Sequence, residues 1–160
     1  MLSIFQIINE YSIRLEHHLK IERDLMNKSF VDSSYQLSEL TGKIIGCAME
    51  VHKVLGNGFQ EVIYQRALGI EMTSQGVEFF REYEMPIVYK DQPIGKRRVD
   101  FFVNNKVMVE LKAISKLEDV HLAQAINYLE AYGLNIGLLI NFGAKKLEFK
   151  RLMNSKAPKR

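Results

Sequence analysis

One stretch of the sequence, residues 96–113 (KRRVDFFVNNKVMVELKA), constrains the fold more than any other. Two short apolar runs, Val99–Val103 and Val107–Leu111, flank the pair Asn104-Asn105. Apolar runs of this length on either side of such a pair are typical of a β-hairpin. We therefore predict two adjacent antiparallel strands in this stretch.

Each predicted strand carries an acidic side chain, Asp100 in the first and Glu110 in the second. Because side chains alternate between the two faces of a strand, Glu110 and Lys112 share one face. Acidic residues are depleted in strands, and burying one without a partner is costly. The two carboxylates and the lysine could be partners for one another, or could hold a divalent metal ion. From the hairpin alone, a half-exposed sheet face with a cross-strand Glu–Lys pair is the simpler interpretation, since such pairs are common.

Composition is that of an ordinary globular chain, with 160 residues, 47% of them hydrophobic and 26% charged, and one domain is the natural expectation. Cys47 is the single cysteine, so neither an intrachain disulfide nor a cysteine-rich zinc site is predicted. No apolar run approaches the ~20 residues of a membrane span. Residues 1–12 (MLSIFQIINEYS) lack the basic start of a signal peptide. We expect a cytoplasmic protein with no small-molecule cofactor.

The net charge of +3 is unevenly distributed along the chain. Residues 1–28 sum to zero and residues 29–141 to −3, whereas residues 142–160 hold seven basic side chains against Glu148 alone and sum to +6. A basic end suits a phosphate-backbone partner, but many solvated tails have the same composition. Charge alone therefore favours nucleic acid only weakly.

The first part of the sequence predicts an amphipathic helix over residues 4–25, followed by a polar linker over residues 27–37. Three interpretations of the helix stay open: it packs on the domain or on a dimer mate, it is a loosely attached extension, or translation starts later, at Met26. We divide the chain into a helical extension and linker (1–36), a main domain (37–153) and a basic tail (154–160).

A second helix is predicted from Ser38, with Ile45, Ala48, Met49, His52 and Leu55 on one side. On that apolar face His52 is more simply a hydrogen-bonded core residue than a catalytic or metal-binding one. Glycines at 56 and 58 then predict a sharp turn. A third helix is expected over residues 61–75, where Glu61 either favours the helix N-terminus electrostatically or points at a metal site.

The remaining elements are predicted to be a strand before the hairpin, a helix after it and then two further strands. We predict a strand over residues 77–89 with an irregularity or edge position at Pro86, and a turn over residues 91–95 before the hairpin. A helix is expected from Ser115, as N-cap with Glu118 completing a capping box, to about Tyr132. Residues 135–141 (NIGLLIN) predict a central strand buried on both faces, and residues 146–153 a closing strand.

Three motifs, in this order along the chain, together resemble a known family. Gly58, Glu61 and Tyr64 match the signature of the GxxExxY family. The pattern D-x9-E-x-K formed by Asp100, Glu110 and Lys112 resembles the core motif of the PD-(D/E)XK nuclease superfamily, of which GxxExxY proteins are a branch. Residues Gln124 and Tyr128 resemble the Q-x-x-x-Y helix motif of its exonuclease-like branches.

This resemblance covers about residues 37–153 and implies a restriction-endonuclease-like α/β fold, a mixed central sheet flanked by helices, with the N-terminal helix as an addition. It also implies an Mg²⁺- or Mn²⁺-dependent nuclease, since carboxylates are the hard oxygen ligands that these ions prefer. The implied metal ligands are Asp100, Glu110, the backbone carbonyl of Leu111 and, directly or through water, Glu61.

Further roles follow from the same resemblance. Lys112 would orient the attacking water and stabilise the transition state, and Gln124 would orient a water or a ligand. Supporting roles fall to Gly58, Tyr64, Tyr128 and His52. The expected partner is nucleic acid, DNA more than RNA, with a homodimer as a further possibility. Candidate phosphate contacts are the basic side chains of Lys96, Arg97, Arg98, Lys145, Lys146 and Lys150.

Two other functions compete with a nuclease. One is a catalytically silent module of the same fold that binds nucleic acid or a protein partner. The other is a metal-dependent hydrolase acting on a different phosphoester. A panel of nucleic-acid substrates separates all three.

Overall fold

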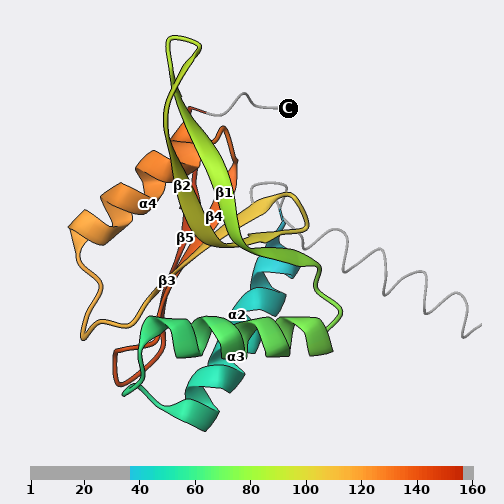
Figure 1. The fold of residues 1–160 in the computed structure, drawn as a ribbon. Coiled ribbons are helices and arrows are strands. Elements are labelled where there is room, and N and C mark those ends of the chain that lie inside the picture. The colour runs from blue at the N-terminus through green and yellow to red at the C-terminus, as the bar shows by residue number, and fades with distance from the viewer. Residues whose placement is uncertain (1–36, 157–160) are drawn as a thin grey trace, which may run out of the picture. The chain divides into compact units, whose positions relative to one another are not determined.

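The structure of the chain is a computed structural model, and it describes residues 37–156 (Figure 1). The helix predicted over residues 4–25 and residues 27–36 of the predicted linker lie outside the described residues. The described elements, in chain order, are helices α2 (Ser38–Leu55) and α3 (Glu61–Ser74), strands β1 (Phe79–Tyr89), β2 (Gln92–Val103) and β3 (Val107–Lys112), helix α4 (Asp119–Ala131), and strands β4 (Ile136–Asn141) and β5 (Glu148–Met153).

The five strands form one mixed sheet in the order β1-β2-β3-β4-β5. Strands β1, β2 and β3 form an antiparallel meander, β3 and β4 are parallel across the α4 connection, and β5 returns antiparallel to β4. Every residue of β4 is buried, as expected for a central strand covered on both faces. This arrangement is the predicted restriction-endonuclease-like α/β fold.

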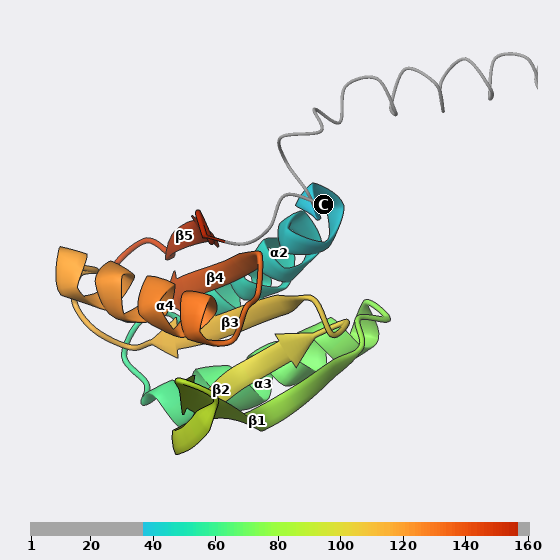
Figure 2. The same cartoon turned by 90° about the horizontal axis from the view of Figure 1, so that it is seen from above.

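Helices cover both faces of the sheet (Figures 1 and 2). On one face, Ala125 and Leu129 of α4 pack in a cluster with Phe102, Met108 and Leu139. On the opposite face lies α3, where Gly69 approaches the rings of Phe79 and Phe101. Among the described residues no helix is both long and apolar enough to cross a membrane.

The predicted hairpin is confirmed. Asn104 and Asn105 both have positive φ angles, 48° and 53°, as the turn between β2 and β3 requires. The prediction for β1 also holds, because it is an edge strand with a register shift between Ile87 and Val88, next to Pro86.

Two predicted element boundaries are wrong. The turn before β2 lies at Lys90-Asp91 rather than at residues 91–95, with positive φ at both positions, so β2 is longer than expected. Helix α4 begins at Asp119, and Glu118 is its N-cap in a capping box with His121, whereas Ser115 lies outside the helix.

The buried face of α2 is also shifted by one residue from the predicted stripe. Ile44, Cys47, Ala48 and Val51 are buried, while Met49 is 51% exposed. Apolar residues occur on more than one side of this helix, so their spacing alone does not fix which side packs inward.

Candidate active site

The site begins where strand β2 leaves strand β3. The register of the two strands runs from Val103↔Val107 to Phe101↔Val109. At the next step the Asp100 carboxylate takes the place of a strand carbonyl, because its Oδ2 accepts a hydrogen bond of 2.8 Å from the backbone N–H of Leu111. The side chain thus closes the end of the β2–β3 pairing.

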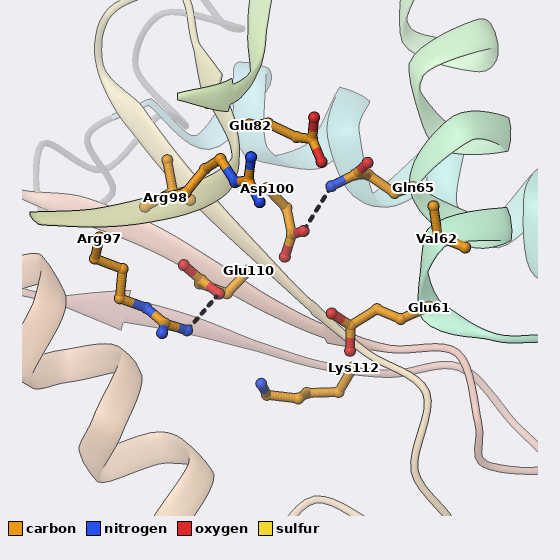
Figure 3. Close-up of a pocket in the computed structure, with 10 residues that line it drawn as sticks. Glu61, Val62, Gln65, Glu82, Arg97, Arg98, Asp100, Glu110 and Lys112 are labelled. Atoms are coloured by element: carbon orange, nitrogen blue, oxygen red, sulfur yellow. Dashed lines mark hydrogen bonds and ion pairs between the residues drawn. The ribbon is translucent and has the colours of Figure 1, made fainter. Parts of the chain in front are cut away.

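A pocket of about 270 Å³ lies beside this point (Figure 3). It gathers Glu61 from α3, Asp100 from β2, and both Glu110 and Lys112 from β3. Side chains from the β2–β3 hairpin and from α3, which lies well before it in the sequence, therefore face one space. The other lining residues are Val62, Gln65, Glu82, Arg97, Arg98 and Val99.

Gln65 is a site residue that the sequence analysis missed. Its amide Nε2 donates a hydrogen bond of 2.7 Å to Asp100 Oδ1, so both oxygens of Asp100 are bound (Figure 3). Gln65 follows Glu61 by one helical turn and therefore shares its face of α3, a spacing that could have identified it. Glu82 of β1, which has a positive φ of 53°, was missed as well, and nothing in its local sequence marks it.

Glu110 is the most deeply buried of the acidic groups, with 4% of its surface exposed. Its Oε2 lies 3.7 Å from Nη2 of Arg97, and its Oε1 is buried with no hydrogen-bond partner among the described residues. Burial, and secondarily the charge of Asp100, raises the pKa of Glu110 to about 7 against the opposing charges of Arg97 and Lys112.

Glu61 is the first residue of α3. Much of its side chain is exposed, yet partial desolvation of the carboxylate in the pocket raises its pKa, and the charge of Asp100 acts in the same direction. Lys112 and Arg97 oppose this shift. The carboxylates of Asp100, Glu110 and Glu61 thus act on one another electrostatically.

Tyr64 stabilises the turn between α2 and α3, and this turn sets the position of Glu61. Its ring is fully buried and stacks on Phe142, with 4.7 Å between centroids. Its hydroxyl donates to the carbonyl of Gly56 at 2.7 Å and accepts from the N–H of Phe59 at 3.1 Å. Gly56 has the positive φ of a helix end, 71°, whereas a Cβ on Gly58 would meet no atom within 4 Å. The predicted turn therefore depends on the left-handed backbone of Gly56, whereas Gly58 has neither a positive φ nor a close neighbour.

Strand β4 and the loop after it fix the end of β3 that carries Lys112. The N–H of Phe142 donates to the carbonyl of Lys112 at 2.8 Å. The fully buried side chain of Asn141 accepts from the N–H of Ile114 at 3.0 Å and donates to its carbonyl at 2.9 Å. Asn141 was not a predicted site residue, although a polar residue ending the run NIGLLIN marks it.

Gln124 and Tyr128 lie on α4 and do not line the pocket. Gln124 Nε2 donates a hydrogen bond of 3.0 Å to the hydroxyl of Tyr128, whose ring lies under the guanidinium of Arg97 at 4.1 Å from its centroid. The two motif residues therefore reach the site through Arg97.

The other predicted residues lie outside the pocket. The Nε2 of His52 lies 3.0 Å from the carbonyl oxygen of Ala144, in agreement with the core interpretation of this histidine. Lys96 forms an exposed ion pair with Glu84 at 2.8 Å. The side chains of Lys145, Lys146 and Lys150 are exposed.

Comparison with known proteins decides the family. A family model described as the PD-(D/E)XK nuclease superfamily matches residues 38–152. The chain belongs to this superfamily. Among solved structures it is similar to the crystal structure of SSO0001, at 17% sequence identity and a TM-score of 0.47, over 59% of this chain and 50% of that one. No curated protein matches.

A PD-(D/E)XK chain is expected to hold a divalent ion, and the donor chemistry of this pocket fits one. Carboxylate oxygens are available from Asp100, Glu110 and Glu61, and the unpartnered Oε1 of Glu110 lacks a cation or donor. Within residues 37–156 no three His, Cys, Asp or Glu side chains lie close enough together to enclose an ion. Carboxylate oxygens are the ligands that Mg²⁺ and Mn²⁺ prefer in proteins.

Proposed function

We propose that this protein is an Mg²⁺- or Mn²⁺-dependent nuclease of the GxxExxY branch, hydrolysing phosphodiester bonds of DNA or RNA. The observation that supports it best is the single pocket in which Asp100, Glu110, Glu61 and Lys112 converge. Three carboxylates and one lysine in a half-enclosed space match what phosphodiester cleavage needs: ligands for a divalent ion and a cation beside the reacting phosphate.

Asp100 and Glu110 would hold the ion, with the carbonyl of Leu111 as a third ligand and Glu61 joining directly or through water. A bound divalent ion supplies an activated water and neutralises charge on the phosphate. The ammonium group of Lys112 would orient that water and stabilise the charge that develops in the transition state. Gln65 would hold the Asp100 carboxylate in place through their hydrogen bond of 2.7 Å.

The substrate would meet the protein first through its phosphates. The loop between β4 and β5 lies against the turn before α3, because Asn57 Nδ2 donates to the carbonyl of Gly143 at 3.3 Å. Lys145 and Lys146 follow in that loop, so they would extend a cationic surface from the Glu61 side of the pocket. Arg97, in contrast, turns inward to Glu110 and is less suited to an outer phosphate contact. DNA is the favoured substrate, and a homodimer and a cytoplasmic location remain predictions.

The test is cleavage of labelled single- and double-stranded DNA and RNA in the presence of Mg²⁺, Mn²⁺ or EDTA. We expect metal-dependent cutting that falls about 100-fold or more in Lys112→Ala, the loss typical of removing a transition-state charge contact. Lys106→Ala, an exposed lysine in the turn between β2 and β3, is the matched control and should cut like the wild type. Cutting that survives in Lys112→Ala or in EDTA would mean a contaminating enzyme or another mechanism.

A catalytically silent module that binds nucleic acid is the second candidate. Both oxygens of Asp100 are already hydrogen-bonded, and no compact cluster of ligands encloses an ion in the described part of the chain. Protein that is folded and binds nucleic acid and Mn²⁺, yet cuts no substrate of the panel, would establish this alternative.

A further inference from the structure

Arg97 of β2 lies between the buried carboxylate of Glu110 and helix α4. Its guanidinium carbon is 4.1 Å from the centroid of the Tyr128 ring, and its Nη2 is 3.7 Å from Oε2 of Glu110. The Glu110 side chain is 6% exposed and that of Arg97 33%. An aromatic face at this distance attracts a guanidinium, most strongly where water is partly excluded.

The contact between Arg97 and Glu110 is incomplete. At 3.7 Å the two groups attract electrostatically but are too far apart for a hydrogen bond. In addition, Arg97 Nε and Glu110 Oε1 are both buried without a hydrogen-bond partner among the described residues. Buried polar atoms are normally bonded, and arginine usually meets a carboxylate through two parallel bonds. Because the guanidinium of Arg97 is stacked on Tyr128, it does not form these two parallel hydrogen bonds with Glu110. The Oε1 atom of Glu110 is therefore available to another ligand.

We propose that Arg97, held on the ring of Tyr128, is the resident counter-charge of Glu110 and competes with the divalent ion for this carboxylate. The inference rests on the proposed function, because it assumes that the ion binds at Asp100 and Glu110. Arg97 lowers the affinity for the ion by repelling it, and compensates the buried charge of Glu110 when no ion is bound. Tyr128, with Gln124 bound to its hydroxyl, is then a positioning residue for Arg97 rather than a catalytic one.

The decisive measurement is Mn²⁺ binding at pH 8.5 under argon, with free Mn²⁺ counted by electron paramagnetic resonance. Arg97→Gln removes the charge, and we expect its Kd for Mn²⁺ to fall about tenfold, because a unit charge a few ångströms from an ion in a partly buried site is weakly screened. Arg97→Lys keeps the charge and should bind Mn²⁺ within about twofold of wild type. Arg98→Gln is the matched control: Arg98 lines the same pocket but is exposed, so its loss should change Kd by less than about twofold.

A double-mutant cycle tests the part played by Tyr128. Tyr128→Leu releases the guanidinium from the ring, so we expect Mn²⁺ to bind about twofold to fivefold more tightly than in the wild type. In Arg97→Gln/Tyr128→Leu the Kd should equal that of Arg97→Gln alone, because the ring acts only through the arginine.

An unchanged or weakened Mn²⁺ affinity in folded Arg97→Gln overturns the inference. If Arg97→Gln fails to fold, the affinity of Tyr128→Leu for Mn²⁺ is the deciding measurement. An affinity equal to that of the wild type would also overturn the inference. Asp100→Asn separates this failure from failure of the proposed function. If Asp100→Asn binds Mn²⁺ as tightly as the wild type, the ion does not bind at the proposed site. If Asp100→Asn binds Mn²⁺ more weakly while the affinity of Arg97→Gln is unchanged, only the competition by Arg97 is excluded.

Discussion

Among the acidic residues that line the pocket, Glu110 is the one most removed from water. Its carboxylate is buried, faces Asp100, and has only a long contact with Arg97. The folded protein therefore binds a proton at Glu110 up to a pH of about 7, whereas the unfolded chain releases it near 4.5. Between these two values the folded state holds more protons than the unfolded state, so the free energy of unfolding falls as pH rises.

We predict that the metal-free protein loses on the order of 2 kcal/mol of stability between about pH 4.5 and 7 because of Glu110. Glu61, whose pKa is also raised, adds to the loss in the same direction. Urea unfolding in EDTA at several pH values measures the effect. In Glu110→Gln most of this pH dependence should disappear, and an unchanged slope in that variant would contradict the assignment.

A second prediction at the residue scale concerns the hydroxyl group of Tyr64. It makes two hydrogen bonds, to Gly56 and Phe59, in a fully buried position. We expect Tyr64→Phe to cost about 1–2 kcal/mol of unfolding free energy, because the buried hydroxyl loses two hydrogen bonds to part-buried backbone groups. Chemical denaturation measures the stability. Cleavage should also fall, since the turn sets the position of Glu61, and a variant as stable and active as the wild type would refute this role.

At the scale of elements, the loop after β4 contains the glycine with the closest neighbours among the described residues. A Cβ on Gly143 would lie 2.4 Å from the N of Ile114 and 2.5 Å from the carbonyl carbon of Ala113, which are rigid backbone atoms. Two segments, one following β3 and one following β4, can lie side by side here only because residue 143 has no side chain.

Gly143→Ala should therefore destabilise the protein by about 1–3 kcal/mol or more, as overpacking against backbone does. It should also move the end of β3 that carries Lys112. Gly95→Ala in β2 is the matched control, because a Cβ there meets no atom within 4 Å. Thermal unfolding of the two variants measures the difference. Equal melting temperatures would show that the loop accommodates the added methyl group without loss of stability.

The elements themselves were largely predictable, whereas the contacts between them were not. The hairpin followed from two apolar runs and Asn104-Asn105, since turn and strand preferences are local. The start of α4 was missed because Ser115 is the favoured N-cap by residue type. In the structure the loop before the helix is held by Glu148, which accepts from the N–H of Leu117, and Glu118 becomes the N-cap. The bond from Gln65 to Asp100 joins residues 35 positions apart, so no spacing rule specifies it.

At the scale of the molecule, the exposed lysines of the described part of the chain differ in whether a carboxylate lies beside them. Lys96 is paired with Glu84 at 2.8 Å on the β1–β2 ribbon. Lys145 and Lys146 are exposed in the β4–β5 loop, beside the turn that leads to Glu61. A lysine already paired with a carboxylate contributes less to binding of phosphates than an unpaired one.

We predict that Lys145→Gln/Lys146→Gln weakens nucleic-acid binding and reduces the slope of log affinity against log salt by about 1.5–2, as expected for two lost phosphate contacts. Lys96→Gln should leave the slope nearly unchanged. Fluorescence anisotropy with a labelled oligonucleotide in EDTA, over a series of salt concentrations, measures both. Equal slopes for the two variants would place the phosphate contacts elsewhere.

The hydrogen bond from Leu111 to Asp100 has an evolutionary consequence. Asp100 completes the end of the β2–β3 pairing, so selection for stability alone favours its retention whether or not the protein cuts. Among the described residues, the side chain of Lys112 has no hydrogen bond or ion pair that would preserve it in the same way. Relatives that have lost their activity should therefore lose the lysine first and keep the aspartate, and the lysine is the better marker of a working enzyme.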